Sequence, residues 1–222
     1  MKEEIKQFVL KQGAHAFGIA DAGDFIEAPI GFKPKDIMPS AQSVIVLGKA
    51  IPKGAMLSAN KCVYTLQGEI TVHELDVLAN KTAHFIEEYG DKAMPIPTDA
   101  PYFHWEEDRK YGMGILSHRH AAVKAGLGTI GKNGLLIHPS YGSCITLVSI
   151  LTDLKLEKDI PIQNELCPPN CKRCLEKCPA KALEGNKIVR QMLCRSHVAT
   201  TSLRGHELVN CWNCRMVCPS NL

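Results

Sequence analysis

Eight of the ten cysteines in this 222-residue chain lie in one short stretch, between Cys167 and Cys218. The pattern C-x2-C-x3-C-P occurs there twice, ending at Cys178-Pro179 and at Cys218-Pro219, with one further cysteine upstream of each copy. In two-cluster ferredoxins, such a run supplies three thiolates to one [4Fe–4S] cluster, and its last cysteine, before proline, binds the other cluster. The sequence therefore predicts two [4Fe–4S] clusters.

The same rule assigns four ligands to each predicted cluster. The first group is Cys167, Cys171, Cys174 and Cys218. The second group is Cys178, Cys194, Cys211 and Cys214. Two spacings are longer than in a ferredoxin run, because three residues separate Cys167 from Cys171 and sixteen separate Cys194 from Cys211. We interpret both as loop insertions that keep the number of ligands.

Structural zinc, free thiols and disulfides are the alternatives for these cysteines. Zinc ribbons use paired C-x2-C hooks and do not need the x3-C-P element. The first residues have no apolar signal core, so we expect a cytoplasmic protein without a disulfide framework. We interpret the two remaining cysteines, Cys62 and Cys144, as small buried hydrophobic residues.

The composition is that of a globular protein, with 45% hydrophobic and 22% charged residues. Its apolar runs are far shorter than the roughly 20 residues of a membrane-spanning helix, so no membrane is expected as a partner. The formal net charge of +3 is too small to predict a nucleic-acid partner.

The hydrophobic pattern changes near residue 160. Residues 1–160 are predicted to form an α/β domain, and residues 161–222 a ferredoxin-like domain that needs metal because its apolar runs are too short for a core. The second predicted helix begins with a capping box, Thr71 to Glu74. Three prolines, Pro95, Pro97 and Pro101, predict an irregular connection. The pattern predicts helices over 2–12, 71–90 and 117–126, and strands over 43–48, 135–137 and 145–151.

A glycine-rich segment occupies residues 125–134. Its G-x-G-x-x-G spacing is that of a dinucleotide-binding loop, but there a strand precedes the glycines and a helix follows them. The predicted order here is the reverse, which argues against a Rossmann site. Two interpretations remain: a tight helix-to-strand turn, or a backbone that closely approaches a large flat or anionic ligand, with Lys132 and Asn133 as polar contacts.

These segments together resemble a known family. The run A-G-L-G-x-x-G-K-N-x-L-L-I from Ala125, the Gly142-Ser143 pair, L-T-D-L from Leu151 and the two cysteine runs look like the epoxyqueuosine reductases. They are similar, more distantly, to the corrinoid-dependent reductive dehalogenases. The resemblance implies an N-terminal corrinoid-binding domain of the nitroreductase-like, cobalamin-processing type and a C-terminal domain whose two clusters reduce the cobalt. It implies corrinoid contacts at Gly128, Gly131, Lys132, Asn133, Gly142 and Ser143.

The catalytic acid that this resemblance implies is not at its expected place. The aspartate of a D-x-A-P-type segment in epoxyqueuosine reductases corresponds in spacing to Gly112. Asp99 has the right neighbours, in Thr-Asp-Ala-Pro, but lies further upstream, and its carboxyl pKa would have to be raised for acid catalysis at neutral pH. Reductive dehalogenases use a tyrosine proton donor near a basic residue, which indicates Tyr111 beside Lys110, or Tyr102. Asp99 and Tyr111 are therefore the catalytic candidates.

The expected function is that of an oxygen-sensitive iron–sulfur oxidoreductase. A low-potential donor of ferredoxin or flavodoxin type reduces the clusters, and single electrons pass to bound cobalamin, which reduces a small molecule. One alternative is an electron-transfer or corrinoid-reactivating protein without a substrate of its own, and another is a flavin-binding version of the same pocket. Because the chain ends at Leu222, without the C-terminal helical domain of tRNA-acting relatives, tRNA is not the expected substrate.

Overall fold

The computed structural model describes residues 1–202 and 204–221 of the chain. Its centre is an antiparallel sheet of four strands, in the order β1 (Ala16–Asp21), β2 (Ser43–Ala50), β8 (Ile145–Thr152) and β3 (Ala93–Ile96). The middle strands β2 and β8 pair from Ser43 opposite Thr152 to Ala50 opposite Ile145. Both strands are buried along most of their length, which accounts for their nearly continuous apolar sequences.

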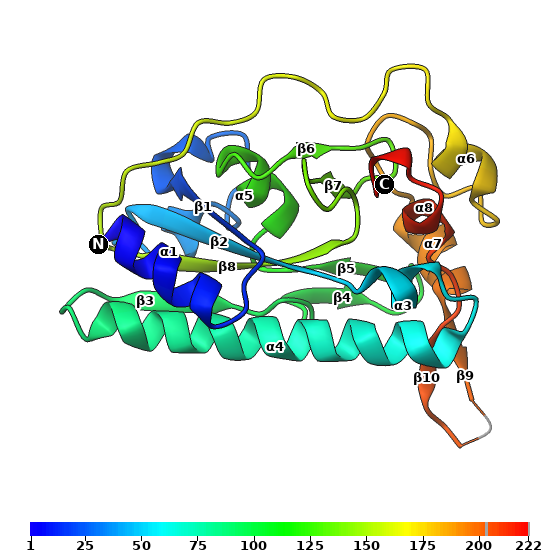
Figure 1. Cartoon of the computed structure of the whole chain (residues 1–222), viewed down its shortest axis with the longest axis horizontal. Coiled ribbons are helices and arrows are strands. Elements are labelled where there is room, and N and C mark those ends of the chain that lie inside the picture. The colour runs from blue at the N-terminus through cyan, green and yellow to red at the C-terminus, as the bar shows by residue number, and fades with distance from the viewer. Residues whose placement is uncertain (203, 222) are drawn as a thin grey trace.

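Helices cover both faces of this sheet (Figure 1). Alternate residues of β2 point to opposite faces, so that Val44 packs in one apolar layer and Ile45 in the other. In the layer of Ile45 lie α1 (Lys2–Lys11) and α4 (Lys61–Glu87). In the layer of Val44 lie α5 (His118–Lys124) and residues at the end of α2 (Pro34–Ile37). The core therefore consists of two apolar layers around one sheet, and the predicted α/β class is confirmed.

The long helix α4 begins at Lys61, well before the predicted start at Thr71. Its cap is Asn60, whose side chain accepts hydrogen bonds from two backbone N–H groups of the first turn. Thr71 lies inside the helix, where its hydroxyl donates to the carbonyl oxygen of Gln67 at 2.6 Å, so the predicted capping box is wrong. The hydrophobic pattern hides the first turns of α4 because their aliphatic residues are exposed rather than buried: Val63, Leu66 and Ile70.

Two other local predictions are wrong in part. Cys144 is buried as predicted, whereas Cys62 is exposed in the first turn of α4. Pro95 lies within β3 rather than in an irregular connection, which is possible because β3 is an edge strand and proline there lacks no necessary ladder bond. None of the helices in the described residues, α4 included, is long and apolar enough to cross a membrane.

Short elements complete the chain. The part before residue 160 also contains η1 (Ala22–Asp24), α3 (Lys53–Leu57), the paired strands β4 (His104–Glu106) and β5 (Tyr111–Met113), and the paired strands β6 (Thr129–Ile130) and β7 (Leu136–Ile137). After β8 a long loop crosses the top of the molecule (Figure 1). It leads to α6 (Arg173–Lys177), α7 (Gln191–Val198), β9 (Ala199–Thr201), β10 (Glu207–Val209), α8 (Asn213–Met216) and η2 (Pro219–Asn221).

One aromatic pair joins the cysteine-rich stretch to the sheet-bearing part. Trp212 stacks on Tyr64 of α4, with ring centroids 4.2 Å apart and an interplanar angle of 5°. The indole Nε1 of Trp212 donates to the carbonyl oxygen of Met56 at 3.0 Å. A third apolar cluster forms around this pair and includes Ile51 and Cys144. The two parts thus share a core, and a domain boundary at residue 160 stays a prediction.

Candidate metal and cofactor site

The first four predicted ligands line one small cavity. Cys167 and Cys171 come from the loop before α6, Cys174 from α6 itself, and Cys218 from the segment after α8. The glycine-rich segment closes the cavity with Lys132, Asn133 and Ile137. Burial raises the pKa of the Cys174 thiol, and the neighbouring thiols Cys167, Cys171 and Cys218 raise it further. The fold therefore brings together the four cysteines of the first predicted group.

The second predicted group gathers beside the first. Burial raises the pKa of Cys194, and the neighbours Cys178 and Cys211 add to that shift. Burial also raises the pKa of Cys214 to about 11, with smaller contributions from other thiols, among which is Cys174 of the first group. Because metal binding requires thiolates, loading this site must release protons.

The spacing within each group matters for the choice of metal. Among residues 1–202 and 204–221, no three Cys, His, Asp or Glu side chains lie close enough together to hold a single metal ion. A tetrahedral zinc ion keeps each thiolate sulfur about 2.3 Å from the metal. A four-iron cube takes one thiolate at each iron and so joins thiols that stand further apart. Zinc and a four-iron cube thus require different spacings of the same thiols, and the iron–sulfur assignment stays a prediction from the sequence.

A buried cation next to these thiols also suits an anionic cluster. The Nη1 atom of Arg215 is buried and has no hydrogen-bond partner in the described part of the chain. Arg215 follows Cys214 in α8, and its positive charge counteracts the burial that raises the pKa of Cys214 and of Cys144. An iron–sulfur cube with four thiolates carries net negative charge, and would supply the interaction that Arg215 lacks.

Two side chains of the glycine-rich segment hold the cysteine loops. The ammonium of Lys132 donates to the backbone carbonyls of Pro168, Pro169 and Cys171, at 3.0 Å for the last. The amide of Asn133 donates to the carbonyl of Cys214 at 3.3 Å. Each side chain thus contacts the backbone of one predicted cluster-binding run.

The glycines of this segment are explained by contacts within the chain. A Cβ at Gly128 would lie 2.2 Å from the carbonyl oxygen of Ile137, and one at Gly131 would lie 2.9 Å from the side-chain oxygen of Asn133. Both glycines are therefore needed for a tight turn between α5 and β7. This geometry favours the interpretation of the segment as a tight helix-to-strand turn over its interpretation as a backbone that closely approaches a ligand.

The Gly142-Ser143 pair contacts the end of the chain. Gly142 has a φ of +53°, and a Cβ there would lie 2.3 Å from the carbonyl oxygen of Ser220. The backbone N–H and the hydroxyl of Ser143 donate to the side-chain oxygen of Asn221, at 2.7 Å and 3.1 Å. The predicted corrinoid contacts with side chains, Lys132, Asn133 and Ser143, therefore all face the cysteine-rich stretch.

The catalytic candidate Asp99 belongs to a polar group that reaches α7. The hydroxyl of Tyr102 donates to the carboxylate of Asp99 at 2.9 Å, and Nη1 of Arg195 lies 3.3 Å from the same hydroxyl. The Arg195 guanidinium is 5.0 Å from the ring centres of both Tyr102 and Trp105. Burial raises the pKa of Tyr102, which keeps its hydroxyl protonated at neutral pH. Arg195 directly follows Cys194, and this position beside a predicted ligand is the only sequence signal for its role.

The other candidate, Tyr111, is placed apart from this group. It lies in β5, with the Arg109 guanidinium 5.8 Å from its ring centre, and no hydrogen bond joins it to Asp99 among the described residues. Its neighbour Lys110 pairs with Glu107 rather than with the Tyr111 hydroxyl. Gly112, where the family's acid was expected, instead bonds through its backbone to Gln191 of α7, at 3.0 Å and 3.1 Å. The geometry therefore favours Tyr102 over Tyr111 as the tyrosine that would act as a proton donor together with Asp99.

Comparison with known proteins gives relatives along nearly the whole chain, although no protein-family model matches it. An epoxyqueuosine reductase of Staphylococcus aureus is 26% identical over 99% of this chain and 58% of its own length. The enzyme of the same name from Bacillus subtilis is 25% identical over 100% of this chain and 64% of its own length. The chain thus spans less than two thirds of the length of these curated relatives.

Solved structures share the fold. The epoxyqueuosine reductase of Streptococcus thermophilus has a TM-score of 0.68 at 21% identity, covering 100% of this chain and 66% of that one. A reductive dehalogenase has a TM-score of 0.75 at 20% identity, covering 99% of this chain and 31% of that one. A further epoxyqueuosine reductase, with a TM-score of 0.67, was solved with an epoxyqueuosine-modified tRNA stem loop. The resemblance predicted from the motifs is confirmed: this chain is similar to epoxyqueuosine reductases over nearly its whole length and has the fold that they share with reductive dehalogenases.

Proposed function

We propose that this protein is an iron–sulfur reductase that passes single electrons through two [4Fe–4S] clusters to a corrinoid. The observation that carries the proposal is the gathering of eight thiols into two adjacent groups of four, with the half-buried Arg215 guanidinium beside them. The similarity to epoxyqueuosine reductases supports a reductase. Bound clusters would supply one-electron reduction, which protein side chains alone do not provide.

The chain's own residues divide the remaining work. Lys132 and Asn133 hold the backbone of the two cysteine runs, and Ser143 holds the chain end that follows Cys218. The Tyr102 hydroxyl donates to Asp99 and lies 3.3 Å from Nη1 of Arg195, the residue after Cys194, and this pair would deliver a proton. A solved epoxyqueuosine reductase of Bacillus subtilis has a catalytic aspartate on a loop that swings out of the active site, which supports an exposed loop residue such as Asp99 as the acid.

The corrinoid part of the proposal rests on similarity rather than on side-chain geometry. A structural neighbour acts by B12-dependent dehalogenation. In this chain, however, the polar side chains expected to contact a corrinoid are bonded to the cysteine-rich stretch, so we derive no step through that cofactor. The same observation favours a second candidate function, that of an electron carrier or corrinoid-reactivating protein without its own substrate.

The substrate class is a separate part of the proposal. We propose a small molecule rather than tRNA, although a neighbour was solved with a tRNA stem loop. Assays of the loaded protein with an epoxyqueuosine-containing stem loop and with small electrophiles such as aryl halides would separate these classes. Turnover of the stem loop alone would contradict the small-molecule proposal.

The experiment that tests the proposed function is an anaerobic iron and sulfide reconstitution followed by titration with cobalamin, and with FMN in parallel. We expect about eight iron ions per chain and a change in the cobalt absorption bands. Cys174→Ala and Cys214→Ala should each remove one cluster's reducible signal, while Cys62→Ala, outside both groups, should change neither. A colourless protein that binds zinc would overturn the cluster assignment. If the clusters form but cobalamin does not bind, the result would favour the electron-carrier function. Binding of FMN alone would favour a flavin site.

A further inference from the structure

Positive charge is concentrated in the cysteine-rich part of the chain. Residues 161–222 contain nine Lys and Arg against four Asp and Glu, whereas residues 1–160 contain seventeen against nineteen. The modest net charge of the whole protein therefore hides a basic region. This region coincides with the two groups of thiols.

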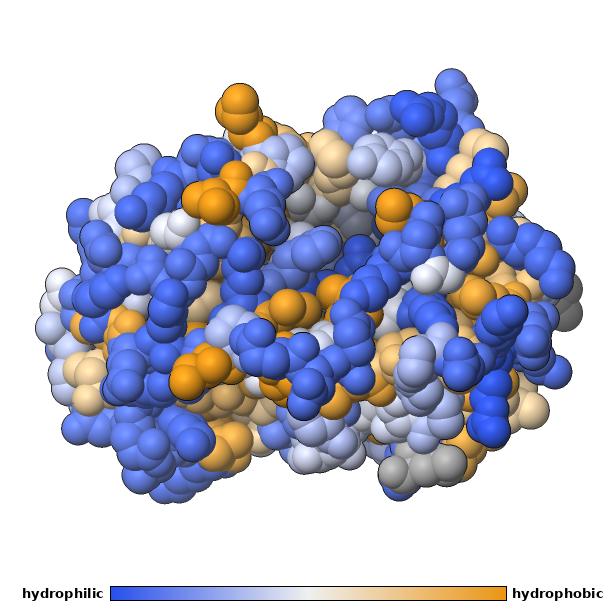
Figure 2. All heavy atoms as spheres, turned by 90° about the horizontal axis from the view of Figure 1, so that it is seen from above, coloured by the Kyte–Doolittle hydropathy of each residue, from blue (hydrophilic) through white to orange (hydrophobic). Residues whose placement is uncertain are grey.

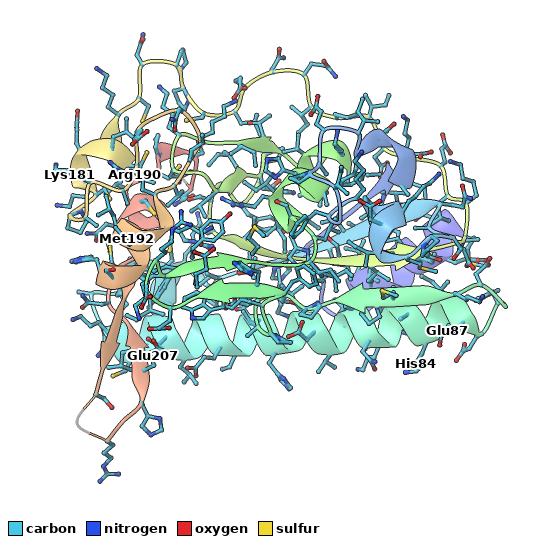
Figure 3. All side chains as sticks on the ribbon, turned by 180° about the vertical axis from the view of Figure 1, so that it is seen from behind. His84, Glu87, Lys181, Arg190, Met192 and Glu207 are labelled. Atoms are coloured by element: carbon cyan, nitrogen blue, oxygen red, sulfur yellow. The ribbon has the colours of Figure 1, made fainter. Side chains whose placement is uncertain are left out.

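Four exposed cations of this region lie in or next to α6. Lys172, Arg173, Lys177 and Lys181 are all exposed. Within residues 1–202 and 204–221, none of the four side chains makes an ion pair, although the nearby cations Lys187 and Arg190 pair with glutamates. Figure 3 shows Lys181 at the α6 end of the molecule, opposite the end of α4 that carries His84 and Glu87. Unpaired like charges repel one another, so their clustering calls for an anionic partner.

An open groove between α6 and α8 lies among these cations. Arg173, Glu176 and Lys177 form one wall, and Met216 and Val217 form the other. Cys218, a predicted ligand of the first cluster, also lines the groove. A cluster held by Cys218 would thus have one edge at the protein surface, between cationic side chains and a small apolar patch.

The two ends of the electron path differ in position. The groove reaches the first group of thiols, whereas the Asp99–Tyr102 pair lies next to Arg195, which follows Cys194 of the second group. The two groups are adjacent, since α6, which carries Cys174, packs against α8, which carries Cys214. Electrons that enter at the groove would therefore pass through both clusters before they reach the part of the molecule that contains the candidate proton donor.

We propose that the α6–α8 groove is the docking site for a small acidic one-electron carrier protein, which reduces the first cluster at its Cys218 edge. The proposal rests on the proposed function because it requires that cluster. With a flavin carrier, one electron leaves the anionic flavin hydroquinone, which becomes the neutral semiquinone. The cluster changes from [4Fe–4S]2+ to [4Fe–4S]1+, and no proton moves.

The chemistry of the groove favours a protein carrier over RNA. Contacts to a phosphate backbone need cations alone, whereas this groove also presents Met216 and Val217, and transient redox complexes combine a small contact area with complementary charge. An acidic carrier would be attracted over several ångströms and positioned by the cations, which speeds association at low ionic strength. Seen from above, the end of the molecule that carries α6 presents hydrophilic side chains interspersed with hydrophobic ones (Figure 2).

The test measures cluster reduction by stopped-flow absorbance, with full-length reconstituted protein and pre-reduced flavodoxin. The double variant Arg173→Glu/Lys177→Glu should slow reduction about tenfold or more at low ionic strength, and salt should diminish the difference. The control Lys11→Glu/Lys35→Glu makes the same change in total charge at exposed positions outside residues 161–222, and should reduce at nearly the wild-type rate. Reduction by dithionite should be nearly the same in all variants.

Other outcomes would overturn the proposal. Equal slowing in both double variants would show a general charge effect, and an unchanged rate with loss of tRNA stem-loop binding would make the groove an RNA site. If the glutamate variant loses iron, Arg173→Gln/Lys177→Gln replaces it, with the same expectation of a slower flavodoxin reaction. A wild-type protein without iron–sulfur absorbance after reconstitution would instead contradict the proposed function, which keeps the two failures distinguishable.

Discussion

At the scale of single residues, Lys132 joins the glycine-rich segment to the first cysteine loop. Its ammonium has three donors and meets three backbone carbonyls, those of Pro168, Pro169 and Cys171. These carbonyls belong to the loop in which Cys167 and Cys171 are one residue further apart than in a ferredoxin run. Lys132 thus binds the backbone of the loop that contains the additional residue.

Replacing Lys132 tests this role. Lys132→Met keeps the length of the side chain and removes its donors, so we expect the free energy of unfolding to fall by roughly 1–3 kcal/mol. Iron should also leave the loaded protein faster when a chelator is added, because the Cys167–Cys171 loop becomes looser. Lys35→Met, at an exposed position far from the cysteines in sequence, is the control. Equal iron release from the two variants would contradict the role.

His118 predicts a pH dependence of stability. Its Nε2 lies 2.8 Å from the carbonyl oxygen of Pro97, which can only accept, so Nε2 carries a proton, and Nδ1 lies 2.8 Å from the Ser149 hydroxyl. Burial lowers the pKa of His118, and the Pro97 carbonyl only partly opposes this. Below about pH 6.5 the unfolded chain therefore binds more protons than the native state, and the free energy of unfolding falls as the pH falls.

The measurement is denaturant unfolding of wild type and His118→Gln at pH 7.5 and pH 5.5. The wild type should lose more stability than the variant over this interval, because glutamine does not titrate. An identical loss in both proteins would mean that His118 does not contribute.

At the scale of elements, α8 depends on a single side chain. The helix is only four residues long, and its preceding residue Trp212 is 6% exposed, stacked on Tyr64 and bonded to the Met56 carbonyl. A helix this short has little stability of its own. Its position, and with it that of Cys214, comes from the packing of Trp212 against α3 and α4.

A graded pair of substitutions tests this dependence. Trp212→Phe retains an aromatic ring but loses the hydrogen bond to Met56, and should cost about 1–3 kcal/mol of unfolding free energy. Trp212→Ala also removes the buried ring and should cost about 3–5 kcal/mol. Iron content after reconstitution should fall in the same order. Full iron content in Trp212→Ala would show that the second group of thiols forms without this anchor.

At the scale of the whole molecule, the chain end holds the cysteine-rich stretch against the sheet-bearing part. Ser143 binds Asn221, and Gly142 allows the backbone of Ser220 to approach closely. Cys218, two residues before Ser220, lines the same cavity as Cys167, Cys171 and Cys174. The two parts of the chain therefore complete the first group of thiols jointly.

Gly142→Ala should separate the two parts locally. The added Cβ would meet the Ser220 carbonyl at 2.3 Å, in a backbone conformation that alanine rarely adopts. We expect the first cluster to be lost and the second retained, measured as iron content and as one remaining reducible signal in electron paramagnetic resonance. Gly54→Ala in α3, where a Cβ has no neighbour within 4 Å, should leave both clusters intact. Loss of both clusters in Gly142→Ala would indicate unfolding instead.

Local sequence determined much of the scaffold and the resemblance. The strands β2 and β8 and the helices α1 and α5 lie where hydrophobic runs and periodicity predict them, because burial of an apolar face is a local pattern. The spacing of the cysteines likewise predicts which thiols belong together, and the fold gathers the same two groups. Their iron and corrinoid stay predictions.

Tertiary structure alone decided which distant groups meet. Three contacts do not follow from spacing: those of Lys132 with its carbonyl partners, of Arg195 with Tyr102, and of Ser143 with Asn221. Each contact joins segments separated by long stretches of sequence. The start of α4 was also hidden, since the aliphatic residues of its first turns, Val63, Leu66 and Ile70, are exposed. Periodicity reports which residues are apolar, whereas the packing of the whole chain determines which polar groups find each other.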